Sequence, residues 1–179
     1  MNKNKNTILS MVFSALCLAL CMVLPFLTGQ IPQIGAMLSP MHIPVLILGF
    51  WAGPLWASIV GFVAPLLRFM LFGMPPILPN GIAMAFELAT YGLVSGFLYR
   101  KLGDSTFSIY ASLIGAMICG RVVWGVARLV ISGIQHTSFT FAAFIAGALT
   151  SAIPGIILHI ILVPLVVAAL KKSGLIIKG

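Results

Sequence analysis

Long apolar segments make up most of the chain, and they constrain its fold more than any other feature. Six of them are separated by short stretches rich in proline, glycine and polar residues. A helix needs about 20 apolar residues to cross the hydrocarbon core of a bilayer. Only 7% of the residues are charged and 61% are hydrophobic, whereas a soluble domain carries about 25% charged residues. The sequence therefore predicts an all-α integral membrane protein and excludes a soluble enzyme.

The breaks between the segments predict a single membrane domain, residues 1–179, built as a bundle of six transmembrane helices. The expected helices cover residues 7–24, 41–50, 55–72, 81–99, 107–131 and 141–170. The stretch 73–80 contains three prolines, which lack a backbone donor and clash with the preceding turn, so we expect no helix there. Pro65 should interrupt the third helix, and Pro154 and Pro164 should bend the last one.

Basic residues outside the apolar segments all fall on one side of this six-helix arrangement. They are Lys3, Lys5, Arg100, Lys101, Lys171, Lys172 and Lys178. Cytoplasmic loops of membrane proteins are enriched in Lys and Arg, so both termini are expected in the cytoplasm. This bias also accounts for the formal net charge of +8, and no nucleic-acid partner is expected. The predicted location is the cell membrane, as a multi-pass protein in the lipid bilayer.

Four ionisable residues remain inside the predicted helices: Arg68, Glu87, Arg121 and Arg128. A charged residue near the bilayer centre costs about 2.5–3.5 kcal/mol on insertion scales, so such residues normally face protein or a wet cavity. Three of the four, all except Arg121, are expected close to the outer loops, which contain no Lys or Arg.

Polar and aromatic residues follow helical spacing in two of the segments. One stripe consists of Asn80, Met84, Glu87 and Tyr91, and the other of Met117, Arg121, Trp124 and Arg128. Two such stripes facing each other would form a pocket for a small polar molecule, and arginine binds carboxylate or phosphate through paired hydrogen bonds. Glu87 could instead form a purely structural ion pair. Three arginines against one glutamate favour at least one arginine being left for a ligand.

The chain shows no sequence sign of catalysis or of a bound cofactor. The three histidines share no metal-ligand spacing, and the three cysteines contain no Cys-x-x-Cys pair. His-Glu-x-x-His and glycine-rich phosphate-binding motifs are also missing from the sequence. We therefore expect no catalytic residue, no metal site and no cofactor. His42, at the start of the second helix, is instead a candidate pocket residue.

Several motifs resemble those of the S components of energy-coupling factor (ECF) vitamin transporters. The motifs are Ala15-x-x-x-Ala19, Met41-His42-Ile43-Pro44-Val45-Leu46, Pro65-Leu66-Leu67-Arg68, the stretches 71–76 and 83–92, and Gly120-Arg121-Val122-Val123-Trp124-Gly125. The resemblance extends over nearly the whole chain. It implies a membrane subunit of a bacterial plasma membrane that binds a vitamin from outside. It also implies docking on a transmembrane coupling protein that carries two ATPase subunits, where ATP hydrolysis takes place.

The resemblance implies roles for individual residues. Ala15 and Ala19 would face the coupling protein, and the segment 30–40 would act as a gate. The implied substrate-binding residues are Gln33, His42, Arg68, Asn80, Glu87, Tyr91, Arg121, Trp124 and Arg128.

The excess of intramembrane arginine favours an anionic B vitamin, and the chain most resembles the pantothenate branch of the family. The carboxylate of pantothenate would pair with Arg128 or Arg68, while Asn80 and Glu87 would bind its hydroxyl or amide groups. Folate, pyridoxine and a hydroxymethylpyrimidine stay open as other substrates. A stand-alone secondary transporter is the alternative of a different class, although such proteins usually show internal repeats and none is seen here.

Overall fold

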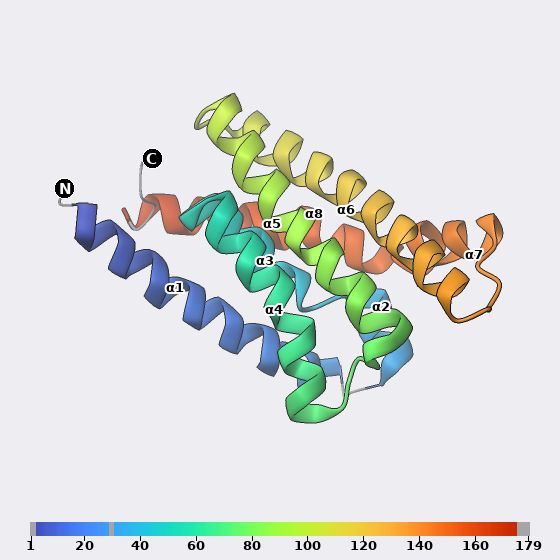
Figure 1. Ribbon diagram of the computed structural model, residues 1–179. Helices are drawn as coiled ribbons and strands as arrows, with labels where there is room; N and C mark the ends of the chain where they lie inside the picture. Colours follow the sequence, from blue (N-terminus) through green and yellow to red (C-terminus); the bar gives the residue numbers. More distant parts are fainter. Residues whose placement is uncertain (1–2, 29–30, 175–179) are drawn as a thin grey trace.

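The computed structural model describes residues 3–28 and 31–174, and every regular element in this part of the chain is helical (Figure 1). The long helices are α1 (Lys3–Val23), α4 (Pro54–Phe72), α5 (Ile82–Leu102), α6 (Thr106–Ile134) and α8 (Ile153–Lys172). The short helices are α2 (Pro32–Leu38), α3 (His42–Ala52) and α7 (Phe141–Ile145). Three helical turns, η1 (Leu24–Thr28), η2 (Ile77–Gly81) and η3 (Ala146–Thr150), lie beside the ends of α1, α5 and α7.

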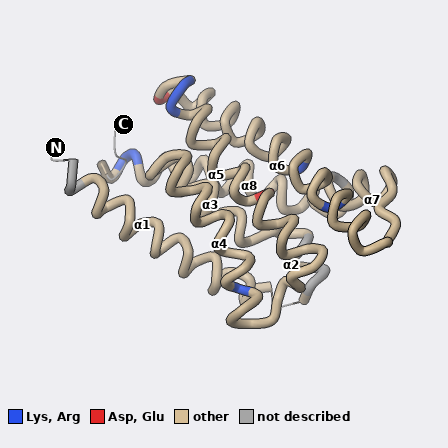
Figure 2. Tube along the Cα trace, viewed as in Figure 1, with Lys and Arg blue, Asp and Glu red and all other residues tan. Residues whose placement is uncertain are grey.

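The helices run between two ends of the molecule that differ in charge. The start of α1, the end of α8 and the turn between α5 and α6 lie at one end (Figure 1). Lys and Arg residues mark this end (Figure 2). Arg100 and Lys101 belong to the last turn of α5, and Lys171 and Lys172 to the last turn of α8. At the other end lie α2, α7 and the connection between α4 and α5 (Figure 1). In the described part of the chain, the basic residues of helix termini and turns thus gather at this end, the basic end, as the loop composition predicts, whereas Arg68, Arg121 and Arg128 lie inside helices.

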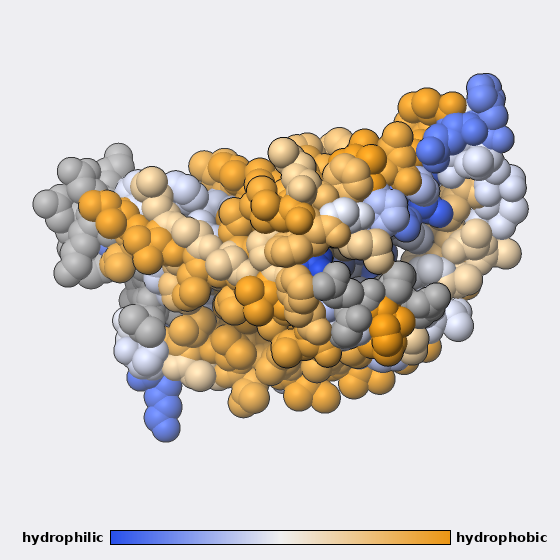
Figure 3. All heavy atoms as spheres, turned by 90° about the horizontal axis from the view of Figure 1, so that it is seen from below, coloured by the Kyte–Doolittle hydropathy of each residue, from blue (hydrophilic) through white to orange (hydrophobic). Residues whose placement is uncertain are grey.

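Five helical stretches are long and apolar enough to cross a membrane. They cover Asn6–Thr28, Pro54–Phe72, Ile77–Leu102, Thr106–Ile134 and Phe141–Lys172. Large apolar side chains on them point outward; Met70 is 79% exposed and Ile134 74% exposed. Figure 3 shows hydrophobic residues over most of one face, with hydrophilic residues toward its ends. A water-facing surface of this kind would be unstable, so the protein is embedded in a membrane.

Helix α5 lies at the centre of the bundle and contacts α3, α4 and α6. Glycines bring its backbone close to that of α4. A Cβ added to Gly92 would lie 2.5 Å from the carbonyl carbon of Ala57, and one on Gly61 would lie 2.4 Å from the carbonyl oxygen of Leu88. Small residues allow such close approach between helices in a membrane. Helix α3, with almost all of its residues buried, fills the space beside this pair.

The prolines act differently from one another. Pro65 lies inside an uninterrupted α4, so the predicted interruption is wrong, and α8 also continues through Pro164. The segment 141–170 instead breaks at residues 151–152, directly before Pro154 in the first turn of α8. Proline fits the first turn of a helix because the N–H that it lacks has no intrahelical partner there. Inside α4, neighbouring helices hold the backbone in place, which lets a membrane helix keep a proline.

Two stretches expected to lack helix contain short helical elements. Within 73–80, Ile77–Gly81 forms a single wide turn, closed by the Gly81 N–H donating to the Pro76 carbonyl at 2.8 Å, while Leu78 stays extended. The segment between α1 and α3 contains η1 and the seven-residue α2. Helix α2 begins with Pro32, whose fixed φ suits a first turn. These elements fold the chain back over the end of the bundle.

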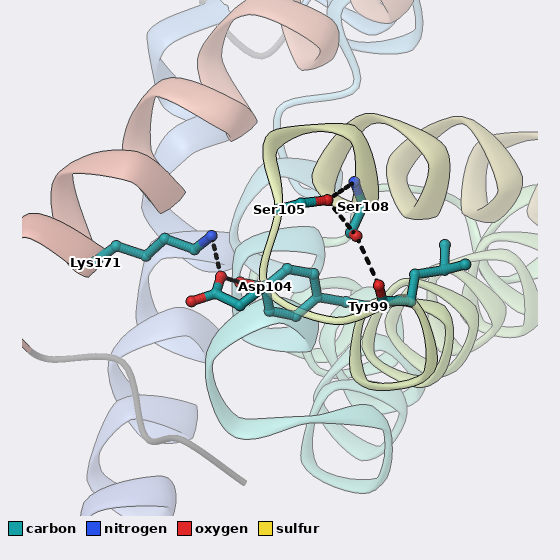
Figure 4. Close-up of polar contacts among 6 residues, drawn as sticks. Tyr99, Asp104, Ser105, Ser108 and Lys171 are labelled. Atoms are coloured by element: carbon teal, nitrogen blue, oxygen red, sulfur yellow. Dashed lines mark hydrogen bonds and ion pairs between the residues drawn. The ribbon is translucent and has the colours of Figure 1, made fainter.

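Polar contacts fasten the basic end (Figure 4). The hydroxyl of Tyr99 donates to Asp104 Oδ1 at 2.5 Å, and Lys171 of α8 forms an ion pair with the same carboxylate. The Ser105 hydroxyl accepts from the Ser108 N–H at 3.1 Å and so caps the start of α6. Arg100 Nη2 donates to the Ala52 carbonyl at 3.0 Å. These bonds tie the α5–α6 turn to α8 and to the turn between α3 and α4.

Candidate ligand-binding cavity

A cavity of about 270 Å³ lies at the end of the bundle opposite the basic end. The described segments 25–28, 31–41 and 74–76, the turns η2 and η3, and the helices α4, α5 and α6 contribute to its wall. Its polar lining residues are Thr28, Ser39, Arg68, Asn80, Glu87, Arg121 and Ser151. Met74, Met84, Trp124 and several prolines supply apolar surface. Apolar walls with a few converging polar groups are typical of small-molecule sites.

The ion pair between Glu87 and Arg121 lies in this wall. Arg121 Nη1 is 2.9 Å from Glu87 Oε1, and the two residues belong to the facing helices α5 and α6. The Glu87 side chain is 1% exposed and that of Arg121 is 16% exposed. A carboxylate buried so deeply needs a cation close by, and Arg121 provides it. The two polar stripes predicted from helical spacing therefore do face each other.

Arg68 enters the cavity wall from α4 and is 3% exposed. Its Nη1 donates to the carbonyl oxygen of Met22 at 2.5 Å. The guanidinium carbon lies 5.2 Å from the ring centroids of both Phe26 and Phe72, a cation–π arrangement. Among the described residues no carboxylate pairs with it. A guanidinium has five N–H donors, so Arg68 keeps a positive charge and further donors beside the cavity.

Arg128 lies behind the cavity wall rather than in it. Its Nη1 donates to Asn80 Oδ1 at 2.8 Å. The guanidinium packs over the rings of Trp124 and Phe139, at 5.9 Å and 5.2 Å from their centroids. Asn80 and Trp124 line the cavity, whereas Arg128 does not. The structure thus links Arg128 to the cavity through these two neighbours.

His42 and Tyr91 form a buried layer behind Glu87. His42 Nε2 is 3.6 Å from Glu87 Oε1, and its ring lies 5.1 Å from that of Tyr91 and 5.8 Å from that of His159. His159 Nε2 lies 3.3 Å from the Ser39 carbonyl oxygen. Neither His42 nor Tyr91 is part of the cavity lining. Their place is next to the ion pair, on its inner side.

A second space, an apolar groove of about 400 Å³, lies between α6 and α8. Its lining includes Tyr91, His159 and a row of lipid-facing α6 residues, among them Ile114 and Ile118. Arg121 lines both the groove and the polar cavity.

Three other predicted residues are Gln33, Ala15 and Ala19. The side chain of Gln33 falls outside the described part of the structure, although its backbone belongs to α2. Ala15 and Ala19 are exposed on the outer surface of α1, one helical turn apart. No helix of the described chain covers them.

Sequence reasoning missed the hydroxyl residues Thr28, Ser39 and Ser151. Each lies at or beside a break in helical structure, next to a glycine or within three residues of a proline. Irregular backbone at membrane depth is tolerated where it lines a cavity or is buried in protein. Hydroxyl residues beside breaks in the helices could therefore have been predicted as cavity-lining residues.

Comparisons with known proteins agree with this arrangement. A protein-family model described as "ECF transporter, substrate-specific component" matches residues 9–167. No curated protein and no solved structure matches the chain. Members of that family are substrate-binding transporter subunits rather than enzymes, and they associate with an energy-coupling module. Because the match covers most of a membrane-embedded helical chain that has a polar cavity at one end, the protein belongs to the family of substrate-specific components of ECF transporters.

Proposed function

We propose that the chain captures an anionic B vitamin, best matched by pantothenate, for an ATP-driven ECF importer. The observation that carries this proposal is the presence of two arginines, Arg68 and Arg121, in the wall of one small cavity. Only one carboxylate, Glu87, lies in that wall with them. Arginine donors beside a partly apolar cavity suit a carboxylate group.

The cavity volume supports a small substrate. About 270 Å³ lies just below the usual range of roughly 300–1,000 Å³ for ligand pockets. Pantothenate, with one carboxylate, two hydroxyls and an amide, suits a site of this size, whereas folate needs more room. In this assignment Arg68 binds the carboxylate, while Arg121 stays paired with Glu87. Asn80 and the hydroxyls of Ser39 and Ser151 pair with the remaining polar groups.

The proposed orientation puts the basic end in the cytoplasm of a bacterial cell and the cavity at the outer surface. All 179 residues would then form one membrane domain with six helices and both termini inside. Helix α3 would be the sixth. With 11 residues it is about 16 Å long, but its burial against α1, α4 and α5 removes any need to span the bilayer on its own.

Docking on the coupling protein is proposed for the surface around Ala15 and Ala19. Both residues are exposed on α1, and small residues one turn apart allow another membrane helix to approach closely. The coupling protein and its two ATPase subunits would supply the energy for transport.

A binding titration tests the proposal. The purified full chain in detergent is titrated with pantothenate, pyridoxine, thiamine, folate and a hydroxymethylpyrimidine, without ATP. Submicromolar binding of pantothenate supports the assignment. Tight binding of a different vitamin keeps the capture role and replaces the substrate. If none of the five binds, while the chain alone transports a vitamin into proteoliposomes under an ion gradient, a secondary transporter replaces the proposal.

A further inference from the structure

We infer that the cavity selects a ligand with a single negative charge and that Glu87 sets this selectivity. The inference rests on the proposed function, because it concerns the ligand of that same cavity. Its basis is the charge carried by the described residues in the cavity wall and the way in which each charge is partnered.

Among the described residues, three ionisable side chains line the cavity: Arg68, Glu87 and Arg121. Arg121 and Glu87 neutralise each other at 2.9 Å. Arg68 forms no ion pair among the described residues; the contacts it makes there are with neutral groups, the Met22 carbonyl and the rings of Phe26 and Phe72. Within the described part of the chain, the wall itself thus carries one positive charge that no carboxylate balances; Arg128, which also has no carboxylate partner there, lies behind the wall. A buried charge without a counterion is costly, so a ligand with one negative charge gives the most favourable balance.

Neutral and doubly charged ligands both compensate the charge of Arg68 less well than a singly charged anion does. A neutral ligand removes water from Arg68 without supplying an anion. A phosphate ester carries about −1.5 to −2 charges near pH 7, which exceeds the single uncompensated positive charge. Its second charge would also lie in the same small cavity as the Glu87 carboxylate, and juxtaposed like charges discriminate strongly against the wrong partner. The ligand class is therefore an unphosphorylated monoanion.

Glu87 has a specific part in this selection. If the cavity served only to attract anions, a buried carboxylate would weaken it. Glu87, 1% exposed, instead cancels one of the two arginines and adds a repulsive group. Replacing Glu87 by Gln keeps the shape of the side chain, leaves two uncompensated arginines and should shift the preference toward dianions.

Three probes test the inference: pantothenate, its neutral alcohol analogue pantothenol, and pantothenol phosphorylated on the hydroxyl that replaces the carboxylate, which carries about −1.5 to −2 charges. Each is titrated into the full chain in detergent at pH 7, by calorimetry. The variants are Glu87→Gln and, as a control, Asp104→Asn. Asp104 is the other acidic residue of the chain. It is 63% exposed at the opposite end of the bundle, so its replacement changes the net charge equally but far from the cavity.

We expect the wild-type chain to bind pantothenate at least about tenfold more tightly than either other probe. In Glu87→Gln the ratio of affinities for the phosphate ester and pantothenate should rise at least about tenfold, while Asp104→Asn keeps the wild-type ratio. Wild-type binding of pantothenol as tight as that of pantothenate, or tighter binding of the phosphate ester, overturns the inference. So does an unchanged ratio in Glu87→Gln. The wild-type ratios test the selection of a single negative charge even if Glu87→Gln does not fold.

The outcomes also separate this inference from the proposed function. If the chain rejects pantothenate but binds neutral pyridoxine tightly, charge selection is wrong and the vitamin-capturing role stands. If it binds none of the vitamins in the titration panel, the capturing role itself is wrong.

Discussion

Arg128 of α6 donates a hydrogen bond to Asn80 across 2.8 Å, and this bond joins α6 to the turn that precedes α5. Asn80 lines the cavity and Arg128 does not. The arginine therefore orients the asparagine, which lines the space that a ligand would occupy. Trp124, under the same guanidinium, is held in the cavity wall in the same way.

A double-mutant cycle tests this link. We expect Arg128→Met and Asn80→Ala each to weaken pantothenate binding, and the double variant to be little worse than either, because both changes break the same bond. Contacting residues show coupling energies of about 0.5–3 kcal/mol in such cycles. The four affinities are measured by calorimetry. Strictly additive losses would show that Arg128 acts on the ligand independently of Asn80.

Arg68 should make the largest single contribution to anion binding. Arg68→Met removes the uncompensated positive charge, and truncating a buried charged partner typically costs about 2–5 kcal/mol of binding free energy. Arg68→Lys keeps the charge but loses the planar donor set, so its loss should be smaller. The measurement is the affinity for pantothenate, with circular dichroism as the check on folding. Equal affinities of the Met variant and the wild-type chain would mean that another group binds the carboxylate.

Leucines at Ala15 and Ala19 should separate binding from transport. The double variant Ala15→Leu, Ala19→Leu should bind pantothenate normally, because both residues lie on the outer surface of α1. Uptake by cells that contain the complete transporter should be lost, since the larger side chains keep the coupling protein away. Ala168→Leu, at an alanine that is also exposed but lies on α8, is the control and should leave uptake unchanged. Normal uptake by the double variant would contradict the docking assignment.

Close contact between α4 and α5 predicts a difference between two helix glycines. Gly92→Val should lower the free energy of unfolding by about 1–3 kcal/mol or more, because its Cβ would meet the backbone of Ala57 at 2.5 Å. At Gly133, nothing lies within 4 Å of an added Cβ, so Gly133→Val should be tolerated. Thermal unfolding in detergent measures both. Similar melting temperatures for the two variants would contradict the close packing.

Much of the site could be predicted from helical spacing. Glu87 lies seven residues after Asn80, and Arg128 seven after Arg121, so each pair shares one face wherever helical geometry continues between its members. The high cost of a membrane charge then requires these faces to meet protein. The structure accordingly pairs Glu87 with Arg121 and Asn80 with Arg128.

Other features depend on tertiary contacts that leave no local pattern. The partner of Arg68 is the backbone carbonyl of Met22, 46 residues away, and any residue type could supply that carbonyl. The continuity of α4 through Pro65 depends on packing against its neighbours. Helix α2 was missed because seven residues are too few for an apolar periodicity to show.

Arg121 borders both the polar cavity and the apolar groove between α6 and α8. The Arg121 side chain thus forms part of the wall that separates the polar cavity from the lipid-facing groove. Glu87 holds that side chain in place, so the ion pair also insulates the cavity from the lipid. A ligand that pulls the guanidinium toward itself would thin this wall.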